Sequence, residues 1–161
     1  MNTDSNGVKH QNLTRKIIGV FFEVYNELGS GFLESVYVEA LALALHEAGL
    51  KVDREVPLSV LFRDRIVGQF RADLVVSGTV LVEAKACASL QTGHKAQILN
   101  YLRATVLEVG LLLNFGPRPT IRRFLFDNAY KTTQRLRTGA VHCEAACPPG
   151  TISSHPLLIR G

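Results

Sequence analysis

Three charged side chains interrupt two apolar stretches that flank a turn signal. The segment 70–85 reads FRADLVV, then a Ser-Gly pair, then TVLVEAK. β-branched runs on both sides of Ser-Gly predict a hairpin. Because side chains alternate along a strand, Glu83 and Lys85 share one face, and Asp73 lies across from Glu83 or close to it. The hairpin therefore brings two carboxylates and an ammonium group to one point on an apolar sheet.

This group of charges has two interpretations. Burying charges costs several kcal/mol unless they are paired or bind a metal. Two carboxylates at one point suit Mg2+ or Mn2+, and a nearby lysine can hold a water molecule or stabilise a developing negative charge. The alternative is a solvated strand face with an ordinary ion pair between Glu83 and Lys85. The hairpin alone does not decide between the two.

The composition is that of one soluble globular domain. The chain has 161 residues, of which 47% are hydrophobic and 20% charged, and this length suits a single core. No apolar run reaches the roughly 20 residues that span a bilayer, and residues 1–11 lack the apolar segment of a secretory signal. We therefore expect a cytoplasmic protein. An odd number of cysteines argues against a disulfide framework, and Cys87 is expected to be a reduced, buried thiol.

Both ends of the chain differ from its middle. Residues 1–12 are polar and residues 128–161 lack periodicity, so we expect both to be poorly ordered around a domain at 13–127. Most of the net charge of +4 belongs to the C-terminal segment, so charge says little about the ligand of the domain. That segment also contains four zinc-ligand types, but their spacing matches no standard zinc module: His142, Cys143, Cys147 and His155.

Two helices are predicted before the first strand, at 12–28 and at 31–48. Glu34 lies in the first turns of the second helix, where the helix dipole favours an acid. Gly31, Glu34 and Tyr37 are expected to line one edge of that helix. The dipole does not explain Gly31, because a glycine weakens a helix but permits close approach of another backbone.

The rest of the domain alternates between strands and one further helix. The predicted elements are strands at 54–62 and 66–76, the second hairpin strand, a helix at 94–105, and strands at 108–115 and 120–126. Pro57 indicates an edge strand, and Gly68 indicates a bulge. Gln97 and Tyr101 are four residues apart and share one helix face. This order of elements requires a mixed sheet covered by helices, an α/β sandwich.

At these residues the sequence resembles the PD-(D/E)XK nuclease superfamily. More closely, it is similar to the bacterial GxxExxY family, whose name is spelled by Gly31, Glu34 and Tyr37 in the segment GFLESVY. Gln97 and Tyr101, in the segment QILNY, resemble the Gln-x-x-x-Tyr motif of RecB-type exonucleases. Each motif is weak alone, but together with the hairpin acids they occur in the right order over roughly residues 14–126. The resemblance favours a functional site at the hairpin.

The resemblance implies a restriction-endonuclease-like fold, a three-layer sandwich with a mixed central β-sheet flanked by helices. It also implies that Asp73, Glu83 and the carbonyl oxygen of Ala84 hold Mg2+ or Mn2+, with Glu34 contributing directly or through water. Lys85 would position the attacking water or stabilise the charged phosphate. Phosphodiester hydrolysis needs both an activated water and neutralisation of charge on the phosphate oxygens.

Further roles follow from the same resemblance. Gln97 and Tyr101 would contact Lys85, the metal-bound waters or the nucleic-acid backbone. Arg71 and His94 are candidates for nucleic-acid contacts, with pairing to an acid and helix capping as their respective alternatives. Some RecB-type relatives carry four cysteines for an iron–sulfur cluster, and this chain, which has 3, is expected to lack one.

The leading hypothesis is a metal-dependent nuclease that acts on DNA or RNA. The second is a catalytically silent binding or interaction module with the same fold, and the third is a stand-alone nucleotide-binding protein. The presence of all the acids and the lysine favours catalysis. The nearly neutral domain favours a substrate that is small or delivered by a partner, and either a homodimer or a partner protein is compatible with this.

Overall fold

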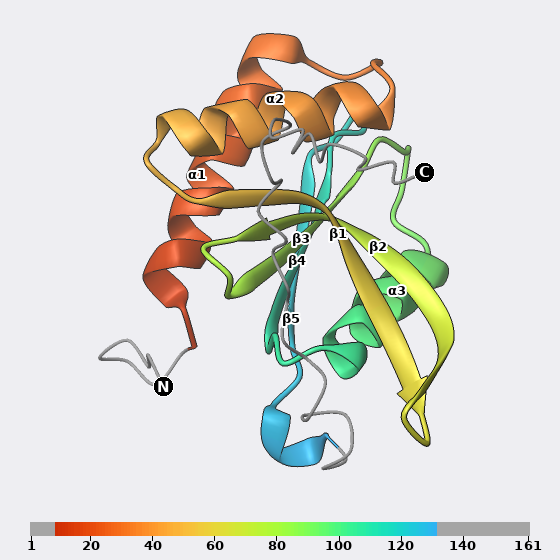
Figure 1. Cartoon of the computed structure of the whole chain (residues 1–161). Helices are drawn as coiled ribbons and strands as arrows, with labels where there is room; N and C mark the ends of the chain where they lie inside the picture. Colours follow the sequence, from red (N-terminus) through yellow and green to blue (C-terminus); the bar gives the residue numbers. More distant parts are fainter. Residues whose placement is uncertain (1–8, 132–161) are drawn as a thin grey trace, which may run out of the picture.

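One five-stranded sheet, in the order β1-β2-β3-β4-β5, forms the centre of the molecule (Figure 1). The structure is a computed structural model, and it describes residues 9–131. Its elements are α1 (Gln11–Leu28), α2 (Glu34–Glu47), β1 (Val52–Phe62), β2 (Arg65–Val76), β3 (Val80–Lys85), α3 (Thr92–Ala104), β4 (Val109–Asn114), β5 (Thr120–Leu125) and a 3-10 helix, η1 (Asn128–Tyr130). β3 and β4 are parallel and the other neighbouring strands are antiparallel. The predicted mixed sheet is confirmed.

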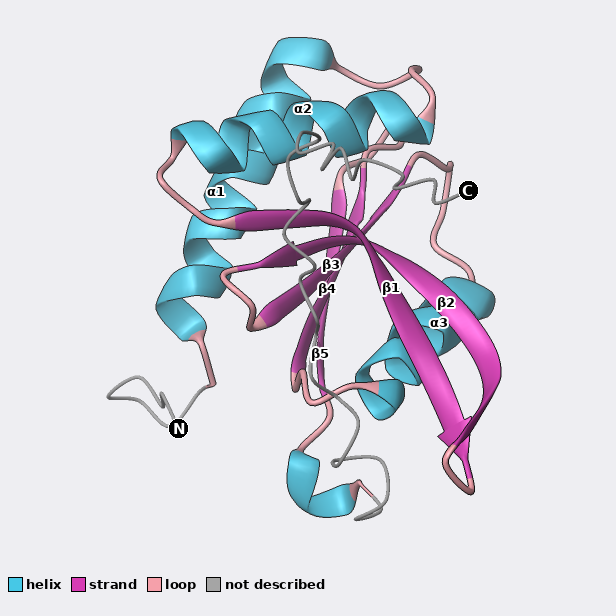
Figure 2. Ribbon diagram, viewed as in Figure 1, coloured by secondary structure: helices cyan, strands magenta, loops and turns pink. Residues whose placement is uncertain are grey.

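Helices cover both faces of this sheet (Figure 2). α1 and α2 pack on one face, where Phe21 and Leu41 are buried with Val82 of β3. Leu81, the preceding residue of β3, is buried on the opposite face with Ile98 of α3. This alternation along a strand is what places a hydrophobic core on each side of a sheet. The expected three-layer α/β sandwich is therefore confirmed.

The second helix begins at Glu34 and not at Gly31 as predicted. Leu33 is its N-cap, and Gly31 lies in the preceding loop with a φ of 115°. Glycine adopts that conformation readily, whereas residues with a Cβ do not. A Cβ at Gly31 would meet no atom within 4 Å. No part of the described chain approaches Gly31 closely, and the path of the loop explains the glycine.

Tyr37 fastens this loop to the core. Its side chain is fully buried, and its hydroxyl donates a hydrogen bond to the carbonyl oxygen of Gly29 at 2.8 Å. The same hydroxyl accepts a hydrogen bond from the backbone N–H of Phe32 at 3.2 Å. Its ring stacks on Phe115, with 4.4 Å between the ring centroids. Tyr37 thus anchors the loop that leads to Glu34 at two positions, Gly29 and Phe32.

The β1–β2 hairpin extends beyond the rest of the sheet (Figures 1 and 2). β2 pairs with β1 along its whole length, but it pairs with β3 only from Leu74 to Val76. We call the projecting part, residues 56–72, the arm; it lies beside α3. β1 is an edge strand as predicted, and the register shifts next to Gly68, which confirms the predicted bulge.

Described helices lie beyond the predicted domain limits of 13 and 127 at both ends. α1 begins at Gln11, and η1 follows Asp127. Lys131 is 7% exposed, and its ammonium group donates to the carbonyl oxygens of Thr105 at 2.8 Å and Leu107 at 2.7 Å. The zinc-ligand types of the C-terminal segment lie outside the described residues. Within residues 9–131, no helix is long and apolar enough to cross a membrane.

The backbone directly after β3 is held against the end of β4. Asn114 is fully buried, and its side chain accepts a hydrogen bond from the N–H of Cys87 at 3.0 Å and donates one to the carbonyl oxygen of Cys87 at 2.8 Å. A Cβ on Gly116 would lie 1.9 Å from that carbonyl oxygen. Glycine is therefore needed at this position, and the contact fixes the chain two residues after Lys85.

We expect Gly116→Ala to lower the free energy of unfolding by about 2 kcal/mol, because the backbone has to move and overpacking costs about 1–3 kcal/mol. Gly19→Ala is the control, since a Cβ at Gly19 in α1 meets no atom within 4 Å. Alanine there should stabilise the helix by about 0.5–1 kcal/mol. Urea unfolding measures both changes, and a Gly116→Ala protein as stable as wild type would contradict this packing.

Candidate active site

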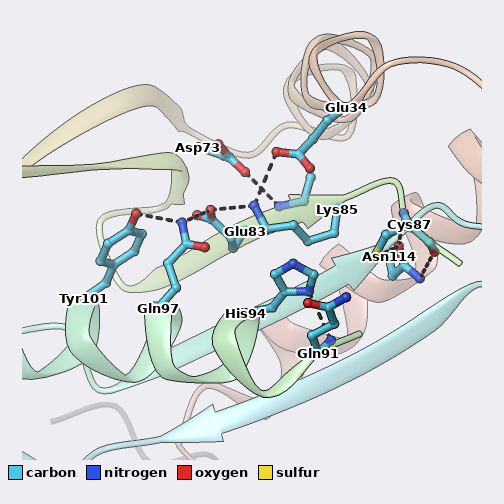
Figure 3. A network of polar contacts seen from close by, with 11 residues as sticks. Glu34, Asp73, Glu83, Lys85, Cys87, Gln91, His94, Gln97, Tyr101 and Asn114 are labelled. Carbon is cyan, nitrogen blue, oxygen red and sulfur yellow. Dashed lines mark hydrogen bonds and ion pairs between the residues drawn. The ribbon is translucent and has the colours of Figure 1, made fainter. Parts of the chain in front are cut away.

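Glu83 carries the most deeply buried carboxylate of the site (Figure 3). Its side chain is 2% exposed. Its Oε1 atom accepts hydrogen bonds from Nζ of Lys85 at 3.1 Å and from Nε2 of Gln97 at 2.7 Å. Its Oε2 atom has no hydrogen-bond partner among the residues that the structure describes. A buried carboxylate oxygen of this kind is a place for a further donor or a cation.

Asp73 reaches β3 from the neighbouring strand. The predicted hairpin is present, with Val76 opposite Val80, although its loop contains three residues, 77–79, where two were expected. Asp73 comes just before the last paired residues of β2, and its Oδ2 atom accepts a hydrogen bond from the backbone N–H of Ala84 at 2.8 Å. This bond orients the carboxylate toward the C-terminal end of β3.

Lys85 connects the acids of the sheet with the acid of α2. Its Nζ atom lies 3.1 Å from Oε1 of Glu83 and 3.3 Å from Oε1 of Glu34. We call Glu34, Asp73, Glu83 and Lys85 together the acid cluster. The Lys85 side chain is 12% exposed and that of Glu34 is 45% exposed, so Glu34 closes the acid cluster on its solvent side. Because α2 begins at Glu34, this carboxylate also lies at the positive end of the helix dipole.

α3 supplies the two remaining predicted residues, Gln97 and Tyr101. Nε2 of Gln97 donates to Oε1 of Glu83 and lies 2.8 Å from the hydroxyl oxygen of Tyr101. Tyr101 is 5% exposed, and its ring lies 5.4 Å from that of Phe70, measured between centroids. The spacing of four residues places both side chains on the face of α3 that meets the sheet. Figure 3 shows them in line with Glu83 and Lys85.

The protonation equilibria of these groups reflect burial and close charges. Burial, together with the negative charge of Asp73, raises the pKa of Glu83 to about 7. Burial also raises the pKa of Asp73, although the hydrogen bond from Ala84 opposes this. For Lys85, burial alone favours the neutral form, but the charge of Glu83 and the hydrogen bond to it outweigh burial and raise the pKa. The cluster thus has more negative charge than one lysine neutralises.

Asp73 and Glu83 are the candidate ligands for a divalent cation. Within residues 9–131, no group of three or more histidine, cysteine, aspartate or glutamate side chains converges on a metal position. Asp73 and Glu83 nevertheless offer hard oxygen ligands, one of them the unpartnered Oε2 atom. Mg2+ commonly binds to one or two carboxylates and keeps several waters. Glu34 contacts the ammonium group of Lys85 in this arrangement, and its predicted part in metal binding remains a proposal.

The other candidate residues make contacts outside this network. Arg71 is exposed and lies 3.4 Å from Glu55, which matches the alternative of pairing with an acid. Nδ1 of His94 accepts a hydrogen bond from the backbone N–H of Gln91, the N-cap of α3, which matches the capping alternative. Cys87 is half-buried, so the expected burial of its thiol was overestimated.

Two features of the site escaped the sequence analysis. Asn114, which holds the chain after Lys85, ends a strand that is otherwise apolar, and a lone polar residue in a buried strand was the available signal. Glu55 has a φ of 48° in the middle of β1, at the level of Asp73. A left-handed conformation is unusual for a residue with a side chain, and no sequence pattern indicates it.

A mixed sheet between helical layers, with acids on adjacent strands and a lysine beside them, defines a restriction-endonuclease-like fold with the features of a nuclease. The model of the PD-(D/E)XK nuclease superfamily matches residues 11–124 of this sequence. These residues make up most of the chain and contain every element from α1 to β4. The chain therefore belongs to the PD-(D/E)XK nuclease superfamily.

No curated protein matches the sequence. A solved structure, titled "Crystal structure of SSO0001", is similar to this chain with a TM-score of 0.43 and 16% sequence identity. The similarity covers 74% of this chain and 60% of that one, so the present chain spans less than two thirds of the length of the other.

In the metal-free protein, the raised pKa of Glu83 predicts that stability falls as the pH rises. The native state keeps this proton up to about pH 7, whereas the unfolded chain releases it near 4.5, so the native state binds more protons between these values. Stability from the protonated carboxyl is therefore fully present below about pH 4.5 and is lost as the pH rises through about 7.

Glu83→Gln removes this titration. The variant should match wild type at the acidic end of that range and exceed it by about 3 kcal/mol above pH 8 in EDTA, because one pKa unit corresponds to about 1.4 kcal/mol. Glu47→Gln, at an exposed position of α2, is the control. Urea unfolding across the pH range checks this, and a stability difference that does not vary with pH would contradict it.

Proposed function

We propose that this chain is a divalent-metal-dependent nuclease that hydrolyses phosphodiester bonds in DNA or RNA. The observation that carries the proposal is the burial of Glu83 beside Asp73, with Lys85 as the neighbouring cation. Membership of the PD-(D/E)XK nuclease superfamily supports it. The segment GFLESVY supports the narrower proposal that the chain is one of the bacterial GxxExxY proteins.

Asp73 and Glu83 would hold Mg2+ or Mn2+, with the carbonyl oxygen of Ala84 and the carboxylate of Glu34 as further ligands. When bound, the ion supplies an activated water and neutralises charge on the phosphate oxygens. The hydrogen bond from Ala84 holds Asp73 in place, and the bond from Gln97 holds Glu83. Both carboxylates are therefore oriented before a ligand arrives, which is what efficient electrostatic catalysis requires.

Lys85 has the properties of an electrostatic stabiliser. Its raised pKa keeps the ammonium group protonated at neutral pH, so it does not act as a general base. Contacts with Glu34 and Glu83 hold Nζ from two sides, next to the carboxylate pair. From there it can donate a hydrogen bond to the attacking water or to a phosphate oxygen on which negative charge develops.

A catalytically silent binding module is the second candidate function. It is favoured by the fact that Lys85 already contacts two carboxylates, so the cluster is partly neutralised without any ligand. In either function, a second copy of the chain or a partner protein would add substrate contacts to those of the nearly neutral domain. The two functions differ in whether nucleic acid is cleaved.

Divalent metal should stabilise the protein, because a ligand that binds only the native state raises the melting temperature. Millimolar Mg2+ or Mn2+ relieves the repulsion between Asp73 and Glu83, so wild type should melt at a higher temperature than in EDTA. Asp73→Asn should lose most of this gain and melt at or above the wild-type temperature in EDTA. Thermal melting measures both proteins, and an equal gain in both would place the metal elsewhere.

Lys85→Met separates the enzyme from the binding module. Methionine keeps the packing of the lysine stem and removes the charge, and Lys85 is not a metal ligand in this proposal. The variant should keep the metal-dependent gain in melting temperature, while cleavage of labelled single- or double-stranded DNA or RNA falls by about 100-fold or more.

Lys51→Met is the matched control, since the Lys51 side chain is 70% exposed and its ion pair, with Asp53, is 3.9 Å long. It should cleave as wild type does in Mg2+ or Mn2+, and neither protein should cleave in EDTA. Cleavage by Lys85→Met at the wild-type rate would refute the mechanism. A wild-type protein that cleaves nothing with any divalent metal would leave the binding module as the function.

A further inference from the structure

A groove of about 260 Å³ lies between the arm and α3. Its walls are Val60 and Phe70 from the arm, and Asn100, Arg103 and Ala104 from α3. Pockets that enclose a drug-sized ligand have volumes of roughly 300–1,000 Å³. The groove is smaller than this. It suits a single planar ring that belongs to a longer ligand, most of which stays in solvent.

The walls of the groove combine an aromatic face, an amide and a cation. Phe70 is 41% exposed, so a large part of its ring is open to a ligand. The guanidinium group of Arg103 lies over the ring of Phe126, with 5.3 Å from Cζ to the ring centroid, a contact that orients the group and leaves its charge in place. None of the residues that line the groove is acidic. These walls therefore favour an aromatic, anionic ligand.

The groove is connected to the acid cluster through Tyr101. The ring of Phe70 lies 5.4 Å from the ring of Tyr101, and the hydroxyl of Tyr101 lies 2.8 Å from Nε2 of Gln97. That nitrogen in turn donates to Glu83 at 2.7 Å. Figure 3 shows Tyr101, Gln97 and Glu83 in one row along α3. A ligand in the groove is thus one row of side chains away from the carboxylate pair.

We infer that the groove binds one unpaired base of a single-stranded nucleic acid, whose backbone continues along α3 to the acid cluster. Phe70 stacks on the base, Asn100 forms hydrogen bonds with the base edge, and Arg103 pairs with a phosphate. The inference rests on the proposed nuclease function and narrows its substrate class. A fully paired duplex does not offer this ligand, because its bases have to leave the stack first.

The first part of the test measures binding without cleavage. Fluorescence anisotropy in EDTA compares a labelled oligothymidylate with a blunt DNA duplex of the same length, and the single strand should bind more tightly. Phe70→Leu keeps an apolar contact with Tyr101 and removes the aromatic face, so it should weaken single-strand binding by about tenfold. Phe22→Leu is the matched control, since Phe22 lies on α1 and is 40% exposed, and it should bind as wild type does.

The second part of the test measures charge. Arg103→Gln should reduce the slope of log affinity against log salt concentration by about 0.7, the value for one phosphate contact on a single strand. Arg103→Lys keeps the charge and should restore most of the slope. Arg15→Gln is the matched control, because it also removes one arginine charge but at an exposed position of α1, which does not line the groove. It should leave the slope unchanged. Thermal melting confirms that each variant is folded.

The outcomes separate this inference from the nuclease proposal. Equal binding by Phe70→Leu and Phe22→Leu, or equal affinity for single strand and duplex, would overturn the groove assignment, while the cleavage assay decides the nuclease proposal on its own. Single-strand binding that depends on Phe70 and Arg103, without cleavage in any metal, would support the groove and reject the nuclease. A wild-type protein that binds no single-stranded nucleic acid would also overturn the groove assignment, and the cleavage assay with Mg2+ or Mn2+ would still decide the nuclease proposal.

Discussion

The contact between the buried Glu83 carboxylate and Lys85 is the interaction on which the site depends. A carboxylate that is 2% exposed is stable only when its environment supplies donors, and these donors and the acid that holds one of them come from different layers of the sandwich. Lys85 extends from β3, Gln97 comes from α3, and Glu34 contributes its charge from the start of α2. Removing Lys85 leaves the Glu83 carboxylate without its counter-ion, removing Gln97 takes away a second donor, and removing Glu34 takes away one of the two acids that hold Lys85. All three layers therefore have to pack correctly before the cluster is complete.

The segment GFLESVY shows how one short motif serves several physical purposes. Gly31 permits the turn that precedes the helix, Glu34 begins the helix and reaches Lys85, and Tyr37 ties the loop to the core through two hydrogen bonds and a stacked ring. The glutamate carries the charge, and the other two residues determine where that charge lies. In this chain the three residues of the motif therefore perform three different tasks, which are to permit the turn, to supply the charge and to anchor the loop.

The sequence contained enough information for the parts of the site that depend on local geometry. Strand alternation placed Asp73 beside β3, and a spacing of four placed Gln97 and Tyr101 on one helix face. The start of α2 was misjudged, because the positive φ of Gly31 belongs to the loop and not to helix propensity. The contact between Glu34 and Lys85 joins residues 51 apart in the chain and depends on how α2 crosses the sheet, which no local pattern encodes.

The projecting arm can open locally without the rest of the sheet. The backbone hydrogen bonds of the arm join only β1 and β2, whose paired residues are near one another in sequence. Its amide protons can therefore exchange through a local opening that leaves the central strands intact. Asp73 lies where the arm joins the sheet, and its bond to Ala84 belongs to the rigid side of that junction. A local opening of the arm would therefore separate the ring of Phe70 from that of Tyr101 while the hydrogen bond between Asp73 and Ala84 stays intact.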